Sequence, residues 1–219
     1  MTDVPPPSSG VPPSGSPAPD AGAALSYGWE QFKRYAGPLI AIIVLPALLQ
    51  IVLSAIGQFV VRGFVGFFVF WVLSLLVGFL AQLGIFNAGL MVTRGEAPDL
   101  GRAFTTDRWG EWFAFAFVFG LMVGVGALFC GVGALVVVAF FGLAPYYFID
   151  QRMGLGDALS RSLETTRSTA GLPLALGLTA LVGMLGFVAC YVGLLVTLPI
   201  AYVGAAFLYR RATGQEVAS

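Results

Sequence analysis

The chain has 219 residues, of which 58% are hydrophobic and only 10% are charged. Soluble domains usually carry about 25% charged residues, so this composition excludes a protein whose main solvent is water. Lys and Arg together number 11, as do Asp and Glu, and histidine is absent. This balance argues against a nucleic-acid partner. Two cysteines are too few for a disulfide framework.

Residues 1–21 differ in composition from the rest of the chain. Seven of the 13 prolines lie between Pro5 and Pro19, among Ser and Gly and without an aromatic residue. Such a segment buries too little apolar surface to offset the entropy of ordering, so we predict a disordered tail. No basic segment followed by an apolar run precedes Asp20, which disfavours a signal peptide. A solvated tether is favoured over a ligand for an SH3-like groove.

From Pro38 onward, apolar runs of membrane length alternate with charged and turn residues. The runs 112–149 and 172–209 are each too long for one pass, so each is expected to fold back on itself. We predict an all-α integral membrane protein with about six transmembrane helices. The predicted spans are 38–56, 66–92, 112–129, 132–149, 172–187 and 191–209. A short tail, 215–219, follows the membrane domain, 22–214.

The distribution of basic residues predicts the orientation. A cytoplasmic N-terminus places ten of the eleven basic residues on the cytoplasmic side and leaves only Arg62 outside. The opposite orientation would run against the known bias of translocation. We therefore expect both termini in the cytoplasm. All eleven acidic residues fall on the same side, so the unopposed cations of an anionic-lipid switch are not expected.

An internal repeat divides the membrane domain. Residues 22–41 align without gaps with residues 156–175, with eight of twenty positions identical. A weaker copy starts at Gly101, and residues 121–154 match the chain again at an offset of sixty. We infer three repeated units, each a cytoplasmic interfacial amphipathic helix followed by a transmembrane hairpin. The units are about 22–95, 99–154 and 156–214.

The repeated segment has the periodicity of an amphipathic helix. Its apolar face holds Leu25, Trp29, Phe32 and Ala36 in the first copy, and Leu155, Leu159 and Leu163 in the third. Such a helix can lie flat at the cytoplasmic membrane surface with its apolar side toward the acyl chains. Simple anchoring is favoured over recognition of a lipid or of a partner.

The Gly-x-Ala-Leu-Ser helices, the paired hairpins and the ending Pro199-Ile200-Ala201 through Tyr209–Gly214 resemble a group of bacterial multipass membrane proteins of uncharacterised function. Proline- and glycine-rich actinobacterial membrane proteins belong to this group. The membrane region preceding some glycerophosphodiester phosphodiesterases is similar. The resemblance covers residues 22–214 and implies a location in the bacterial plasma membrane. It implies no catalytic residue, because the phosphodiesterase half, with its acidic metal-site residues and histidines, has no counterpart here.

Patterns that carry catalytic chemistry are sparse. Without histidine there is no Ser-His-Asp triad and no His-ligated metal, and the two cysteines are far apart. The acidic pairs Glu96 with Asp99 and Asp107 with Glu111 have carboxylates that suit a divalent cation. Solvated helix faces are the better interpretation, because Arg102 and Arg108 lie close to them in sequence. We expect no cofactor, no metal and no enzymatic activity.

No predicted span has an ionisable residue in its interior, where pumps and proton-coupled carriers usually place one. The polar residues of the spans are instead expected to serve helix packing. We expect a non-enzymatic accessory or scaffold of the cell envelope. Its candidate partners are the lipid bilayer and either another membrane protein or a second copy of the chain. The alternatives are a small carrier or channel for a lipid or uncharged solute and, third, a lipid-modifying enzyme.

Cys130 and Cys190 occupy matching repeat positions, and we expect both near the outer hairpin tips. A disulfide between them would need Cα atoms within about 7 Å. Two ordinary buried small residues are the favoured alternative.

Proline residues indicate where a ligand would bind. Pro46, Pro145 and Pro199 lie inside the first, fourth and sixth spans, and each removes a backbone donor. Carriers often build their sites at such broken helices. We therefore hypothesise a cavity between the fourth and sixth spans that opens toward the cytoplasmic leaflet. Its predicted lining is Asn87, Tyr146, Tyr147, Thr197 and Tyr202. The alternative is that the prolines only shape the bundle.

Overall fold

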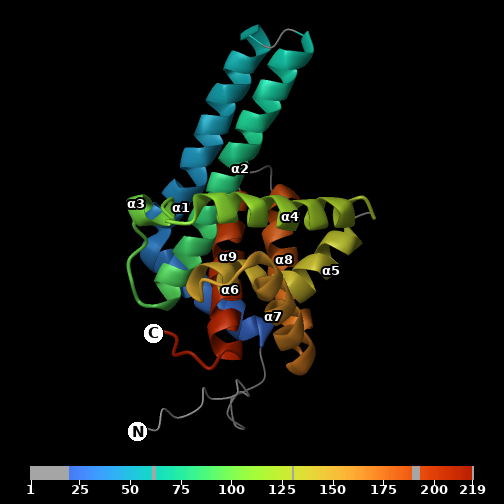
Figure 1. Ribbon diagram of the computed structural model, residues 1–219. Coiled ribbons are helices and arrows are strands. Elements are labelled where there is room, and N and C mark those ends of the chain that lie inside the picture. The colour runs from blue at the N-terminus through green and yellow to red at the C-terminus, as the bar shows by residue number, and fades with distance from the viewer. Residues whose placement is uncertain (1–19, 61–62, 130, 189–192, 219) are drawn as a thin grey trace, which may run out of the picture.

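The computed structural model describes residues 20–60, 63–129, 131–188 and 193–218, and every regular element in these ranges is a helix (Figure 1). The helices are α1 (Ala21–Val60), α2 (Gly63–Thr93), α3 (Leu100–Ala103), α4 (Trp109–Ala127), α5 (Val132–Phe141), α6 (Ala144–Asp150), α7 (Leu155–Ser168), α8 (Leu172–Val188) and α9 (Leu194–Ala212). The predicted tail lies almost wholly outside the described residues. Cys130 and Cys190 lie outside them as well.

In the described part of the chain, five stretches of helix are long and apolar enough to cross a membrane, and a sixth is added if the bent pair α7 and α8 forms one span. The predicted all-helical class is therefore confirmed. Each predicted span falls on one helix or on a consecutive pair. The fourth span is interrupted, because α5 ends at Phe141 and α6 begins at Ala144.

Both strong copies of the repeated segment form a helix that ends in a sharp bend. Tyr35, with φ −122° and ψ 29°, interrupts α1. Thr169, the residue aligned with Tyr35, caps the end of α7, and α8 then leaves at 112° to α7. Gly171 in this bend has φ 83°, a backbone conformation that favours glycine. The weaker copy from Gly101 forms only the short helix α3.

The face that each of these helices buries lies beside the predicted apolar stripe. Aligned positions on this face hold the buried residues Ala24, Gly28 and Phe32 in α1, and Ala158, Ser162 and Thr166 in α7. Phe32 belongs to the predicted stripe as well, but Trp29 of that stripe is 46% exposed. Small residues such as Ala24 and Gly28 favour this face, because they allow backbones to approach closely. A Cβ atom on Gly28 would lie 2.5 Å from the carbonyl oxygen of Ile200 in α9.

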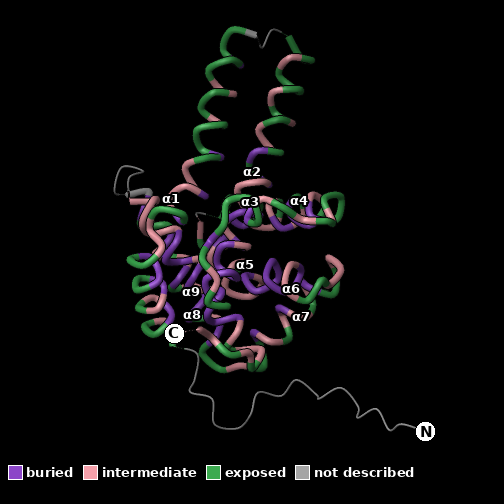
Figure 2. Tube along the Cα trace, turned by 90° about the vertical axis from the view of Figure 1, so that its left-hand side faces the viewer, coloured by how far each residue is buried: buried purple, intermediate pink, exposed green. Residues whose placement is uncertain are grey.

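The outer parts of α1 and α2 form a projecting hairpin that we call the arm, residues 45–60 and 63–76 (Figures 1 and 2). Most of its large apolar side chains are exposed, up to 83% at Phe64. The two helices of the arm are joined by a hydrogen bond of 3.1 Å from Gln50 Nε2 to Ser74 Oγ. Phe70 also packs against Gly57. In Figure 2 the buried residues gather below the arm.

The core lies where α2, α4, α6 and α9 meet. Trp112, Phe115, Tyr146 and Tyr209 are among its fully buried side chains. The Trp112 indole nitrogen donates to the Phe79 carbonyl oxygen at 3.1 Å. This bond fixes α4 against α2, because a buried indole N–H needs a partner.

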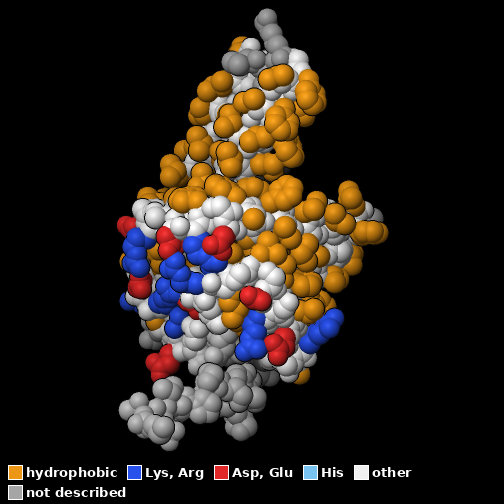
Figure 3. All heavy atoms as spheres, in the orientation of Figure 1, with side chains coloured by type: hydrophobic (Ala, Val, Ile, Leu, Met, Phe, Trp, Pro, Cys, Tyr) orange, Lys and Arg blue, Asp and Glu red, His pale blue; other side chains and the backbone are white. Residues whose placement is uncertain are grey.

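All charged residues that the structure describes belong to four segments, 20–34, 94–111, 150–167 and 210–216. On the face shown in Figure 3 they gather below the arm, while the arm itself is apolar. We call this part of the molecule the charged end. The distribution separates an apolar region, with no charge in the described part of the arm, from a region rich in ion pairs.

Candidate functional site

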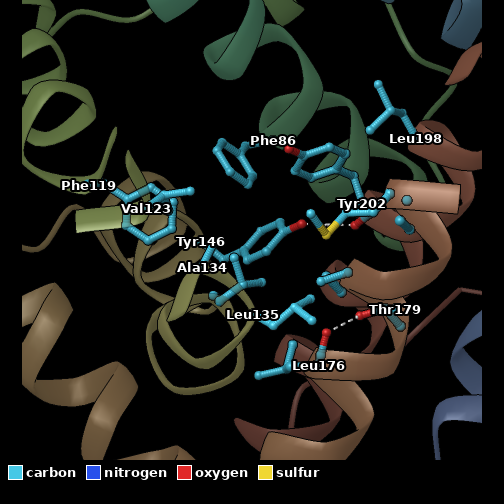
Figure 4. Close-up of a pocket in the computed structure, with 17 residues that line it drawn as sticks. Phe86, Phe119, Val123, Ala134, Leu135, Tyr146, Leu176, Thr179, Leu198 and Tyr202 are labelled. Carbon is cyan, nitrogen blue, oxygen red and sulfur yellow. Dashed lines mark hydrogen bonds between the residues drawn. The ribbon is translucent and has the colours of Figure 1, made fainter. Parts of the chain in front are cut away.

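A cavity of about 340 Å³ lies among α2, the hairpin α4–α5 and the hairpin α8–α9 (Figure 4). None of the residues that line it is charged. Phe86, Phe119 and Leu135 contribute apolar walls from three different helices. Most of the surface is therefore suited to an apolar ligand.

The break in the fourth span shapes one wall. Pro145 stands in the first turn of α6 and has no N–H to continue the α5 ladder. The carbonyl oxygen of Phe140, at the end of α5, accepts hydrogen bonds from Ser162 Oγ at 3.1 Å and Thr166 Oγ1 at 3.2 Å. Hydroxyl groups on α7 thus supply hydrogen-bond partners to a backbone carbonyl at the interruption. Broken helices need such partners inside a membrane.

Two tyrosines form the polar side of the cavity. Tyr146 follows the break directly, is fully buried and donates from its hydroxyl to the Tyr202 carbonyl oxygen at 2.9 Å. Both rings meet the Phe86 ring edge-on, with centroid distances of 5.3 Å for Tyr146 and 5.2 Å for Tyr202. Figure 4 shows the three rings side by side. These contacts hold α2, α6 and α9 together at the cavity.

The Tyr202 hydroxyl has no hydrogen-bond partner among the described residues. The other two hydroxyls of the lining, on Tyr146 and Thr179, already donate; Thr179 Oγ1 donates to the Leu176 carbonyl oxygen at 2.9 Å. Their lone pairs can still accept. The cavity therefore offers one free donor within an otherwise apolar lining.

The structure brings together two of the five predicted cavity residues, Tyr146 and Tyr202. Asn87 instead donates from Nδ2 to the Ala103 carbonyl oxygen at 2.8 Å and joins α2 to α3. The Tyr147 hydroxyl pairs with Thr165 Oγ1 at 2.7 Å, and Thr197 donates to the Gly193 carbonyl oxygen at 3.0 Å. Asn87 and Tyr147 thus connect helices elsewhere in the protein, while Thr197 bonds within the first turn of its own helix.

Sequence reasoning missed the part of the cavity formed by α8. Thr179 was interpreted as a packing residue, while Ala180 and Gly183 were not singled out. A usable signal was present, because Ala180 and Gly183 are small residues three apart on one helical face. A Cβ atom on Gly183 would lie 3.2 Å from the Ala201 Cβ. Small residues thus bring α8 and α9 together beside the cavity.

Residues near the C-terminus are hydrogen-bonded to the charged end. Asp150 pairs with Arg94 and accepts hydrogen bonds from Tyr209 and Gln215. Ala218 is also anchored, since its N–H donates to the Thr93 carbonyl oxygen at 3.1 Å. In the described ranges, no group of three or more His, Cys, Asp or Glu side chains is placed to hold a metal ion.

One ion pair outside the apolar helices joins two loops. Arg152, whose backbone has φ 53°, binds the exposed carboxylate of Asp107. The hydrogen bond from Arg152 lowers the pKa of this carboxyl. The pair connects the segment before α4 with the segment after α6.

Together these features define the class of the protein: its described residues are all-helical, with five to six helices apolar and long enough for a membrane, around an apolar cavity. No protein-family model matches the chain, and no curated protein or solved structure matches it.

Proposed function

We propose that the chain is a multipass protein of the bacterial plasma membrane with both termini in the cytoplasm. The grouping of charges at one end supports this proposal, because positive charges favour the cytoplasmic side and charged side chains avoid the hydrocarbon core. Under this topology α1 and α2 cross the membrane, with the arm as their outer part, and the charged end lies at the cytoplasmic surface. The resemblance to bacterial multipass proteins supports the same location.

Equivalent contacts support the proposed three repeated units. Gly28 in α1 packs on Ile200 of α9, and Ser162 in α7 binds the Phe140 carbonyl oxygen of α5. Gly28 is aligned with Ser162 in the first repeat match, and Phe140 is aligned with Ile200 in the match at an offset of sixty. Two aligned helices thus contact two aligned residues.

The middle unit supports the same pattern less extensively. Its α3 meets α2 through the hydrogen bond from Asn87 to the Ala103 carbonyl oxygen. Each proposed unit therefore places its first helix against the second part of another unit's hairpin. α3 packs on the first unit, α7 on the second and α1 on the third, which closes a ring.

The proposed function is that of a non-enzymatic accessory or scaffold within the cell envelope. The observation that carries it is the arm. α2 has 31 residues and is about 46 Å long, whereas the hydrocarbon core is about 30 Å thick. The arm is the outer part of this length (Figure 1), and its exposed apolar side chains present a contact surface within and beyond the lipid. We propose that this surface binds another membrane protein or a second copy of the chain.

Photocrosslinking in intact membranes tests the scaffold. A crosslinking amino acid at Phe67, which is 58% exposed on the arm, is expected to capture a protein. The same amino acid at Leu174, which is 68% exposed on α8, is the control and is expected to capture lipid only. Equal capture of lipid alone at both positions would reject the scaffold.

A second candidate is a small carrier for a lipid or an uncharged solute, and the cavity favours it. Reconstituted liposomes separate the two candidates. A carrier accelerates swelling in an uncharged osmolyte or the exchange of a fluorescent lipid between leaflets. A scaffold leaves both rates at the level of protein-free liposomes.

A further inference from the structure

The cavity has the properties of a site for one hydrocarbon chain. Its volume of about 340 Å³ lies at the lower end of the range for ligand pockets. Apolar side chains form nearly all of its surface, so a sugar or an ion would lose hydration without compensation. Hydrocarbon fills such a space without this cost.

Access to the cavity is from the side of the bundle. Met184, at its rim on α8, is 43% exposed, and Ala180 and Gly183 lie on the same helix. Their small size leaves space in the cavity beside Met184. Because no lining residue is charged, an occupant arriving from the bilayer meets only apolar walls.

The position of the Tyr202 hydroxyl indicates how a lipid in the cavity would lie relative to the charged end. Tyr202 lies eight residues before Arg210, which is about 12 Å along α9. Tyr146 lies four residues before Asp150 in α6. Ala205 on α9 and Leu176 on α8 continue the apolar lining from Tyr202 toward the charged end, while Met184 lies nearer the hairpin tips. A lipid whose headgroup lies at the charged end therefore brings an ester carbonyl to Tyr202 when that ester is drawn about 12 Å into the cavity, where the carbonyl has lost water and needs a donor.

We propose that this cavity holds one acyl chain of an ester-linked bilayer lipid from the leaflet at the charged end, and that Tyr202 donates a hydrogen bond to the ester carbonyl. The donor has no competing partner in the described part of the protein. The Tyr146 hydroxyl holds the Tyr202 backbone in place through its bond to that residue's carbonyl oxygen. This inference rests on the membrane topology proposed above and not on the scaffold role.

Filling the cavity tests its occupant. Protein purified through mild detergent is expected to retain one lipid per chain, counted by native mass spectrometry. Ala180→Leu extends a side chain into the cavity and is expected to reduce retention about tenfold, through steric overlap. Ala114→Leu adds the same atoms at an exposed position on α4 and should leave retention unchanged. Equal retention in the two variants, with unchanged thermal unfolding, would overturn the proposal.

Replacing the donor tests the hydrogen bond. Wild-type protein is expected to bind an ester-linked phosphatidylglycerol about fivefold more tightly than its ether-linked analogue. Tyr202→Phe keeps the ring and should abolish this preference. Tyr147→Phe, whose hydroxyl lies outside the cavity, should preserve it. The absence of a preference in the wild type, or its persistence in Tyr202→Phe, would reject the role of the hydroxyl. Photocrosslinking from the arm does not depend on the results of these two lipid experiments. The proposed scaffold function and the proposed lipid site can therefore be rejected separately.

Discussion

The arm and α9 are both apolar helical regions, but they use their apolar residues in opposite ways. In the most apolar stretch of α9, 50% of the residues are buried by the protein, against 11% in α2. Yet among the five candidate spans of the described residues, those in α1 and α2 are the most apolar and the one in α9 is the least apolar. Between α2 and α9, burial by protein and hydrophobicity therefore differ in opposite directions.

This contrast follows from what each helix contacts. The arm presents Phe, Leu and Val outward, where lipid is the natural solvent. α9 carries the small residues Ala201, Gly204 and Ala206, which let α8, α1 and α2 approach. Its Tyr202 lines the cavity and its Tyr209 is hydrogen-bonded to Asp150. Helix association in lipid depends on close packing and on hydrogen bonds rather than on hydrophobicity. The less apolar helix is therefore the one at the centre.

The largest expected effect distinguishes core from arm directly. Trp112→Ala removes a fully buried ring and the hydrogen bond to Phe79, and should lower the free energy of unfolding by about 3–5 kcal/mol. Phe64→Ala removes an exposed ring from the arm and should change the free energy of unfolding by about 0.5 kcal/mol or less. Unfolding in mixed micelles measures both. Similar losses would mean that the arm is packed against protein.

The next effect concerns close helix contact. Gly28→Ala places a Cβ atom 2.5 Å from the Ile200 carbonyl oxygen and should cost about 1–3 kcal/mol, because α1 must move away from α9. Gly120→Ala is the matched control, since nothing lies within 4 Å of its Cβ position. That change should stabilise α4 by about 0.5–1 kcal/mol. If both substitutions stabilised the protein in micelles, the α1–α9 contact would be looser than described.

A smaller effect is expected from one buried hydrogen bond. Tyr146→Phe keeps the ring against Phe86 but removes the donor to the Tyr202 carbonyl oxygen. Interhelical hydrogen bonds in membranes average about 0.6 kcal/mol, so a loss of this size is expected in the same assay. In the double variant with Trp112→Ala, the loss of unfolding free energy should be smaller than the sum of the two single losses, because Phe86 contacts both rings. A loss above about 3 kcal/mol would indicate a packing role that the hydroxyl alone does not explain.

The sequence predicts the helices better than it predicts the site. Hydropathy is local, so the six apolar spans and the two amphipathic segments follow from composition and period alone. Pro145 also indicated the break in the fourth span. The cavity lining depends on how each helix is rotated, which local sequence does not determine. Tyr146 and Tyr147 are neighbours in α6, yet one lines the cavity and the other bonds α7.

The smallest effect is confined to the charged end. The hydrogen bond from Arg152 lowers the pKa of Asp107 in the folded protein. A carboxyl whose folded pKa is depressed contributes stability above its unfolded pKa of about 3.9, and loses that contribution as pH falls through the folded pKa. The pair is exposed, so its contribution is small.

Asp107→Asn should therefore lower the melting temperature slightly at neutral pH, and the difference from the wild type should shrink below about pH 4. Arg152→Gln should have the same effect, and the double variant should add nothing further. The described arm carries no charged residue, so the fluorine NMR signal of fluorotryptophan at Trp71 in the arm, resolved from the other three tryptophans and recorded in the folded protein, should not follow this pH change. A difference that persists unchanged at pH 3 would mean that the Asp107 carboxylate does not stabilise the fold through Arg152. A Trp71 signal that follows the titration would mean that the arm and the charged end are coupled, and the contrast between the two regions would then need revision.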